Sequence, residues 1–232
     1  MDERDSISGV WREALTIMFS YPLATIAPAV VLGAIAGIPA YLIEGFPILD
    51  NALTYLTAAF VYYLYLAYAE GITTRAERTR DRIVLRAMFS ELRRAIPFVL
   101  RVLIAALVTT SIASVATVLL VVPGAWLFTR WSLSTPVICK EDLGALGALR
   151  RSNELVRRRF WFVFTTATLA FVLEEMAVHG GALAGFEIFG SPTWGEWIGG
   201  SVLIALAMPL AAFTTSVAYS SVARLAKPVA DA

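Results

Sequence analysis

The sequence predicts an all-α protein that crosses a membrane six times and carries amphipathic helices on the membrane surface. Composition is the first observation: 58% of the 232 residues are hydrophobic and the mean hydropathy is +0.71, whereas ordinary soluble domains contain roughly 45–50% apolar residues. Arrangement is the second, because long apolar runs recur along the whole chain and leave no separate polar block. We therefore expect residues 1–232 to form a single integral membrane domain.

Six segments approach the length of a spanning helix, which needs about 20 mainly apolar residues. We place the spans at Pro22–Ile43, Ala52–Ile72, Pro97–Val122, Gly124–Cys139, Phe160–Val178 and Trp194–Val222. The fourth segment is the shortest of the six and contains a charged residue, Arg130.

The distribution of basic residues predicts the orientation, because short cytoplasmic loops collect Lys and Arg. The connections 44–51, 122–124 and 179–193 contain neither residue. The other two connections carry Arg75, Arg78, Arg80, Arg82, Arg86, Arg93 and Arg94, and then Lys140, Arg150, Arg151, Arg157, Arg158 and Arg159. This alternation favours six spans with both termini in the cytoplasm.

Three segments that precede spans have the spacing of amphipathic helices. Residues 1–21 contain the clearest one, because Ile7–Tyr21 places its apolar residues on one helical stripe. Ile83–Ile96 repeats the pattern, and Leu143–Val156 repeats it more faintly. One interpretation is a threefold internal repeat of an interfacial helix followed by two spans. The alternative is that any basic cytoplasmic connection looks amphipathic.

Residues 122–164 contain a recognisable motif, "VPGAWLFTRWSLSTPVICKEDLGALGALRRSNELVRRRFWFVF". The segment resembles the signature of a prokaryotic multi-pass family typified by the membrane domain of glycerophosphodiester phosphodiesterases, which includes related uncharacterised membrane proteins. The matching positions are Pro123, Gly124, Arg130, Pro136, Glu141, Ala148, Arg151, Ser152, Leu155, Phe160 and Trp161. In that family a separate soluble domain carries the phosphodiester chemistry, and this sequence has no such domain. The resemblance therefore implies a six-span architecture in a prokaryotic cell membrane and implies no reaction.

Arg130 is the most conspicuous polar residue of the predicted spans. Counting about 1.5 Å per residue from Lys140 places it near the middle of a hydrocarbon core roughly 30 Å thick. A charge at that depth costs between about 2.5 and 17 kcal/mol, so we expect Arg130 to face the interior of the bundle. Glu174 and Glu175 lie at a similar height on the next span, and one of them is the predicted partner. The pair either locks helix packing or forms a polar site for an anionic headgroup or solute.

Other polar and small residues suggest further contacts. Arg101 and Glu70 form a second candidate pair near the cytoplasmic ends of their spans, where snorkelling would also explain them. His179, with Glu175, Glu174 and Glu187 nearby, fits an interfacial polar cap better than a metal site, because there is no second histidine. Glycines four residues apart at 33–37 and 181–185 allow close helix approach, and packing inside the chain is the favoured interpretation.

The sequence lacks the patterns of most enzymes. It contains no glycine-rich phosphate loop with its lysine and no combination of nucleophile, base and orienting residue. A net charge of +1 gives no indication of nucleic-acid binding, and the single cysteine, Cys139, cannot form an internal disulfide. We expect a non-catalytic protein without cofactor or metal that binds or moves a membrane lipid or small amphiphile. The alternatives are an accessory subunit that assembles with a membrane partner or a second copy, and, less favoured, a membrane-embedded enzyme.

Overall fold

The computed structural model describes residues 6–37, 47–79, 85–119, 121–191 and 194–226, and these residues form helices with short connections and no strand. The helices are α1 (Ile7–Ser20), α2 (Pro22–Gly37), α4 (Pro47–Thr79), α5 (Leu85–Leu119), α6 (Val121–Trp131), α7 (Ser134–Glu141), α8 (Ala145–Arg158), α9 (Phe160–Phe189) and α10 (Trp194–Ala226). The all-α prediction is confirmed for the described part of the chain.

The amphipathic segment at the start of the chain folds as expected into α1. Ser6 caps this helix by accepting a hydrogen bond from the backbone N–H of Gly9 at 3.0 Å. The apolar stripe of α1, which includes Val10, Ala14 and Ile17, is buried against the rest of the protein. At Tyr21 the chain turns by 86° into α2. Pro22 is the first residue of α2, where its missing N–H would have no helical partner in any case.

Two tyrosines of α4 join this helix to α2. Pro28 lies inside α2 and cannot donate a backbone hydrogen bond to the carbonyl of Ala24, four residues earlier. The Tyr68 hydroxyl donates to that carbonyl at 2.6 Å, and the Tyr65 hydroxyl donates to the carbonyl of Thr25 at 2.8 Å. Both tyrosine side chains are fully buried. The side chains of α4 therefore satisfy backbone groups of α2 inside the protein.

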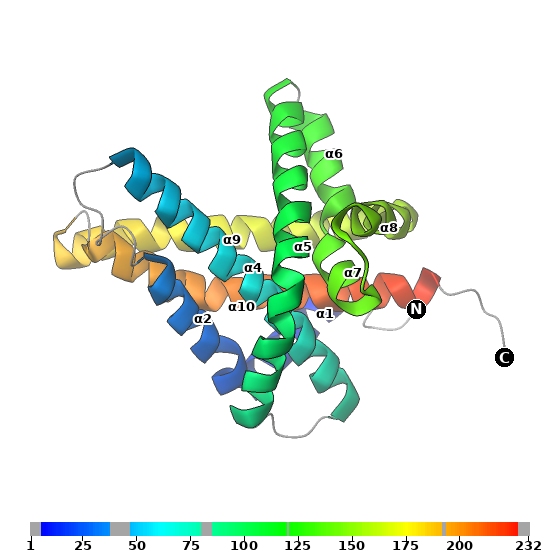
Figure 1. Ribbon diagram of the computed structural model, residues 1–232, viewed down its shortest axis with the longest axis horizontal. Helices are drawn as coiled ribbons and strands as arrows, with labels where there is room; N and C mark the ends of the chain where they lie inside the picture. Colours follow the sequence, from blue (N-terminus) through cyan, green and yellow to red (C-terminus); the bar gives the residue numbers. More distant parts are fainter. Residues whose placement is uncertain (1–5, 38–46, 80–84, 120, 192–193, 227–232) are drawn as a thin grey trace.

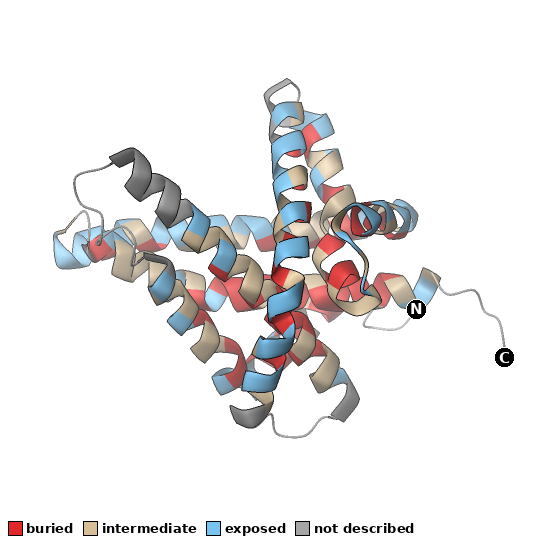
Figure 2. Cartoon of the chain, in the orientation of Figure 1, coloured by how far each residue is buried: buried red, intermediate tan, exposed pale blue. Residues whose placement is uncertain are grey.

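The helices form pairs that diverge from a common centre (Figure 1). Helices α5 and α6 lie side by side, α9 and α10 form a second antiparallel pair that α5 crosses, and α2 packs against α4 and α10. Buried residues gather where the pairs meet, and exposed residues cover the outer parts of α5 and α9 (Figure 2). One buried cluster lies mainly between α1, α2, α4 and α10, and a second lies mainly between α5, α7, α8 and α10. Helix α10 contributes to both clusters and is the central helix of the fold.

Three described helices are long and apolar enough to cross a membrane, and a bent pair would make a fourth. The three segments are Ala87–Ala113, Phe160–Phe189 and Gly195–Ala226, and the bent pair is α1 with α2. The apolar helices α5 and α9 bury only a minor share of their surface inside the protein. These three to four apolar helices are consistent with membrane localisation.

The structure corrects several predicted boundaries. The predicted span Gly124–Cys139 is not one helix, because the chain breaks after Trp131 and divides it between α6 and α7. The predicted interfacial segment Ile83–Ile96 is not a separate helix either, since its residues from Leu85 onward continue without a break into the following apolar helix α5. The predicted span Pro97–Val122 ends earlier, at Leu119. Residues 38–43 of the first predicted span lie outside the described residues.

Glycines bring the backbones of α9 and α10 into direct contact. A Cβ atom added to Gly181 would lie 2.5 Å from the carbonyl oxygen of Gly199, and one added to Gly185 would overlap the carbonyl oxygen of Gly195. The two glycines of α10 face the same restriction from α9. The prediction that the 181–185 pair packs inside the chain is confirmed. Gly33 of α2 also faces α10, where an added Cβ would lie 3.9 Å from Ile204, an ordinary van der Waals distance.

Replacing Gly185 with alanine should destabilise the fold, because the added methyl group can fit only if α9 and α10 move apart. Overpacking of this kind costs about 1–3 kcal/mol or more, which thermal unfolding of the purified protein in detergent would detect. Gly180→Ala is the matched control, since a Cβ at Gly180 meets nothing within 4 Å and alanine is the better helix former. Equal stability of the two variants would contradict the role assigned to the glycine contact.

Candidate functional site

A cavity of about 640 Å³ lies between α4, α5, α9, α10 and the segment where α6 gives way to α7. Its volume is within the range of about 300–1,000 Å³ that small-molecule sites occupy. Most of its lining is apolar, with residues such as Leu66, Ile204 and Met208. The polar lining residues are Tyr62, Tyr63, Glu70, Thr109, Thr110, Ser132, Ser134, Thr135, Glu174, Glu175 and Thr215. The cavity therefore combines an apolar body with a limited set of polar groups, as small-molecule sites do.

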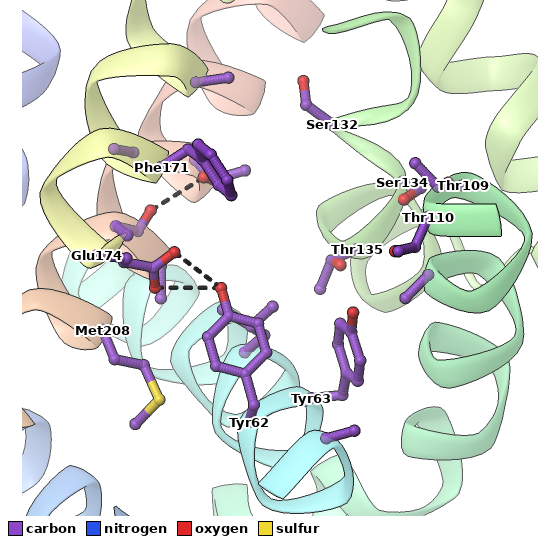
Figure 3. Close-up of a pocket in the computed structure, with 18 of the residues that line it drawn as sticks. Tyr62, Tyr63, Thr109, Thr110, Ser132, Ser134, Thr135, Phe171, Glu174 and Met208 are labelled. Carbon is purple, nitrogen blue, oxygen red and sulfur yellow. Dashed lines mark hydrogen bonds between the residues drawn. The ribbon is translucent and has the colours of Figure 1, made fainter. Parts of the chain in front are cut away.

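Glu174 of α9 and Tyr62 of α4 form the principal polar contact of one wall (Figure 3). The Tyr62 hydroxyl lies 3.1 and 3.0 Å from the two carboxylate oxygens of Glu174. No Lys, Arg or His lines this cavity among the described residues. Glu174 is thus held by a hydroxyl group and has no cationic partner in the described part of the chain.

Hydroxyl groups gather on the opposite wall, where Thr109, Thr110, Ser134 and Thr135 lie across the cavity from Glu174 (Figure 3). The break between α6 and α7 brings the two α7 residues to this wall. Thr109 is 8% exposed and its Oγ1 has no hydrogen-bond partner. A buried hydroxyl without a partner is uncommon in native proteins.

A second cavity, of about 540 Å³, lies beside the first and has a charged lining. Its ionisable residues are Glu70, Arg75, Glu77, Glu91, Arg94, Cys139 and Lys140. Glu91 is buried and receives a hydrogen bond from Arg75 at 2.8 Å, while Arg94 lies 3.5 Å from it. Glu70 lines both cavities and therefore forms part of the wall between them.

Glu70 is the centre of a buried polar network that joins α4, α7 and α10. Its Oε2 accepts a hydrogen bond from Ser216 at 2.6 Å and lies 3.4 Å from the Nζ atom of Lys140. Lys140 in turn donates to the hydroxyls of Ser216 and Ser220, each at 3.1 Å. The side chain of Glu70 is only 4% exposed and that of Lys140 16%. The two charges compensate each other where water is largely excluded.

Glu141, the residue after Lys140, belongs to a second polar network. Glu141 accepts hydrogen bonds from Arg151 of α8 at 3.0 Å and from the Tyr219 hydroxyl of α10 at 2.8 Å. Desolvation acts to lower the pKa of the Arg151 guanidinium, but its hydrogen bonds to Glu141 and Glu154 and their negative charges outweigh desolvation and raise this pKa. Lys140 thus attaches α7 to Glu70 of α4, and Glu141 attaches α7 to Arg151 of α8 and Tyr219 of α10.

The motif positions of residues 122–164 meet around α7 and α8. Glu141 pairs with Arg151, and the Ser152 hydroxyl donates to the backbone carbonyl of Arg130 at 2.8 Å. Pro136 and Gly124 are buried, whereas Pro123 is exposed near the start of α6. These contacts join α6, α7 and α8, and none of these seven positions lines either cavity.

The predicted pairing of Arg130 with Glu174 or Glu175 is wrong. The Arg130 guanidinium donates to the side-chain oxygen of Asn153 at 2.7 Å and stacks 3.9 Å from the ring centre of Trp126. The prediction counted depth along one straight helix, but the chain breaks after Trp131. At the end of α6 the Arg130 side chain reaches Asn153 of α8, while Phe128 contacts Phe171 of α9. Arg130 is partly buried against protein groups, in keeping with the expected interior position.

The predicted pair of Arg101 and Glu70 is also wrong. Arg101 bonds Asp142 at 2.6 Å, and both side chains are exposed. Arg101 lies on the outer face of α5, while Glu70 faces α7 and α10, so the two residues do not meet. His179 contacts Glu175, one helical turn earlier: its Nδ1 lies 3.0 Å from the carbonyl oxygen and 3.4 Å from the carboxylate of Glu175. Within the described ranges, no group of three or more His, Cys, Asp or Glu side chains is placed to hold a metal ion.

Sequence reasoning missed four residues of the sites, namely Tyr62, Lys140, Ser216 and Ser220. Lys140 was counted only as a basic residue of a cytoplasmic connection. The serines are four residues apart and therefore lie on one face of α10, and such a polar pair in an apolar segment is a signal that could have been used. Tyr62 lies in a run of aromatic residues that does not distinguish it from its neighbours.

Comparisons of the chain with protein-family models, with curated proteins and with solved structures found no match.

Breaking the Glu70–Lys140 pair from one side should destabilise the protein strongly. Lys140→Met leaves a buried carboxylate without its counter-charge, and such changes cost about 3–5 kcal/mol. The double variant Glu70→Gln with Lys140→Met removes both charges and should recover much of this loss. Unfolding measurements on the two single variants and the double variant give the coupling energy. A coupling energy near zero would contradict the structural role of the pair.

Proposed function

We propose that the protein is a non-catalytic membrane protein that binds an amphiphile in the cavity between α4, α5, α9 and α10. The main support for this proposal is the cavity itself, whose volume of about 640 Å³ and mainly apolar lining suit a hydrocarbon chain. Hydroxyl and carboxylate groups on two facing walls suit a polar headgroup. The exposed apolar residues of the surrounding helices support a position of this cavity next to lipid, from which an amphiphile would enter.

The proposed topology has six passes with both termini in the cytoplasm, as the basic residues predict. The second pass is α4, which has 33 residues and a length of roughly 50 Å at 1.5 Å per residue. The fourth pass is the broken segment made of α6 and α7. Support for this arrangement comes from Figure 1, where the meeting ends of α5 and α6 and of α9 and α10 lie far from the C-terminal ends of α4 and α10.

The proposal of an internal repeat has local support at two corners. Tyr21, between α1 and α2, has φ −130° and ψ 53°, and Arg159, between α8 and α9, has φ −137° and ψ 45°. In both places a short amphipathic helix precedes a long apolar one. The resemblance of residues 122–164 to a six-span family favours the same architecture. The second copy departs from the pattern because its first helix is fused into α5.

An accessory role is the alternative, and the apolar side of α5 favours it. Leu100, Ile104, Leu107 and Ile112 are all exposed on this helix. Lipid would cover such a face, and so would the spans of a partner subunit. The two functions differ in whether the cavity is occupied by a small molecule, which the following measurement decides.

Filling the cavity should abolish ligand capture without unfolding the protein. Ala106→Phe introduces a large ring into the cavity lining, whereas Leu107→Phe changes the neighbouring residue of α5, which is 66% exposed and does not line the cavity. The probes are three photoreactive C12 amphiphiles that differ only in their headgroup, namely an amine, an alcohol and a carboxylate. In nanodiscs, at least one probe should label cavity residues of the native protein and of Leu107→Phe, with that labelling largely lost in Ala106→Phe. Equal labelling of the two variants by every probe would contradict binding in the cavity.

The topology can be tested with single cysteines in a Cys139→Ser background. A cysteine at Ser191, beside the α9–α10 turn, should react with a membrane-impermeant maleimide on intact cells. A cysteine at Arg158, at the end of α8, should react only after the membrane is permeabilised. The reverse pattern would contradict the proposed orientation.

A further inference from the structure

The ionisable side chains that line the cavity are not balanced in charge. Three carboxylates line it, those of Glu70, Glu174 and Glu175, and no described lining residue is Lys, Arg or His. Lys140, outside the cavity, compensates Glu70, and His179 lies beside Glu175. Glu174 receives only the neutral Tyr62 hydroxyl. Glu174 is therefore the carboxylate that lacks a positive partner in the described part of the chain.

A carboxylate with apolar surroundings is stabilised best by a positive charge. One hydroxyl bond replaces only part of the hydration that the ionised group would have in water. The bonds from Tyr62 hold the carboxylate in place and leave room for further donors, because an ionised carboxylate can accept about four hydrogen bonds. A cationic ligand that enters the cavity would supply the missing charge.

Aromatic rings around the carboxylate point to the same kind of ligand. Tyr62, Tyr63, Phe128, Trp131 and Phe171 all line the cavity. Tyr62 and Tyr63 meet edge to face with ring centres 5.3 Å apart, and Phe128 and Phe171 do so at 5.7 Å. The faces of aromatic rings attract ammonium groups, and cages that combine such rings recognise amines. Phe171 and Tyr62 lie on the two sides of Glu174 in Figure 3.

The opposite wall offers hydrogen bonds to the rest of a headgroup. Thr109 is more than nine-tenths buried, lines the cavity and has an Oγ1 atom without a hydrogen-bond partner. Thr110, Ser134 and Thr135 line the same wall, so a ligand headgroup would meet hydroxyl groups there. This observation is independent of the charge of Glu174.

From these contacts we infer that the cavity selects an amphiphile with an ammonium headgroup, which binds at Glu174 among the aromatic rings while its hydrocarbon chain lies along the apolar walls. The inference rests on the proposed function, because it requires that the cavity binds an amphiphile. It also corrects the sequence-based alternative of a site for an anionic headgroup at Arg130, since Arg130 does not line the cavity and the lining carries carboxylates in place of cations.

Competition among the three headgroups tests the inference. Dodecylamine, dodecanol and dodecanoate are titrated at pH 7 against the photoreactive amine probe with the protein in nanodiscs of a neutral lipid. The amine should bind at least about tenfold more tightly than the alcohol, a difference of about 1.4 kcal/mol, and the carboxylate should bind most weakly. The same titration with Ala106→Phe, in which the cavity is filled, measures how much of each amphiphile partitions into the nanodisc lipid. This contribution is subtracted.

Two variants assign the preference to one group. Glu174→Gln keeps the shape of the side chain and removes its charge, so the amine should lose its advantage over the alcohol while the alcohol still binds. Glu187→Gln, an exposed position on the same helix that does not line the cavity, should keep the preference.

The outcomes separate the inference from the proposed function. If the amine and the alcohol bind equally well to the native protein and both lose binding in Ala106→Phe, the cavity binds amphiphiles but the inferred ammonium selectivity is wrong. Tighter binding of the carboxylate, or an amine preference that survives Glu174→Gln, would also overturn the inference. If no probe binds the native protein better than Ala106→Phe, the proposed function itself fails.

Discussion

The ion pair between Glu70 and Lys140 is the interaction on which the arrangement of the site depends. The two residues are far apart in the sequence, and Ser216 and Ser220 of α10 bond them from a third helix. Both side chains are largely buried, so water can replace a lost partner only in part, and the pair is stable only when α4, α7 and α10 hold their positions together. Because Glu70 lines both cavities, the same contact also forms part of the wall between the apolar and the charged cavity.

The short helix α7 transmits this constraint to the rest of the second half of the chain. Its last two residues, Lys140 and Glu141, bind in opposite directions, toward Glu70 and toward Arg151 and Tyr219. For α7 to reach these partners, the chain breaks after Trp131, and α6 ends against α8. The break directs Arg130 to Asn153 and brings Ser134 and Thr135 to the cavity wall. A single interruption of one helix thus accounts for both the unexpected partner of Arg130 and the polar side of the cavity.

The close contact of α9 and α10 explains why a cavity forms elsewhere. At the glycines the two backbones touch, so this pair leaves no space between its helices. In the view of Figure 1, α4 and α5 run at an angle to this pair, and the larger cavity lies where α4 and α5 face α9 and α10. The surrounding helices expose apolar side chains such as Leu100 and Met176, which suits a lipid environment. An amphiphile is therefore the class of ligand that both the cavity and its surroundings favour.

The sequence by itself determined the features that depend on local patterns. Hydrophobic spacing predicted the all-α class and the amphipathic helix that begins at Ile7, and small residues four apart predicted the contact of Gly181 and Gly185, because each of these follows from the 3.6-residue period of one helix. Which charged residues pair was decided only by the tertiary structure. The heights of Arg130 and Glu174 along ideal helices do not predict where a helix breaks. The positions of Arg101 and Glu70 in the sequence do not predict which face of α5 points outward. A buried charge selects its partner from the groups that several crossing helices bring within a few ångströms, and those crossings depend on contacts between residues far apart in the chain.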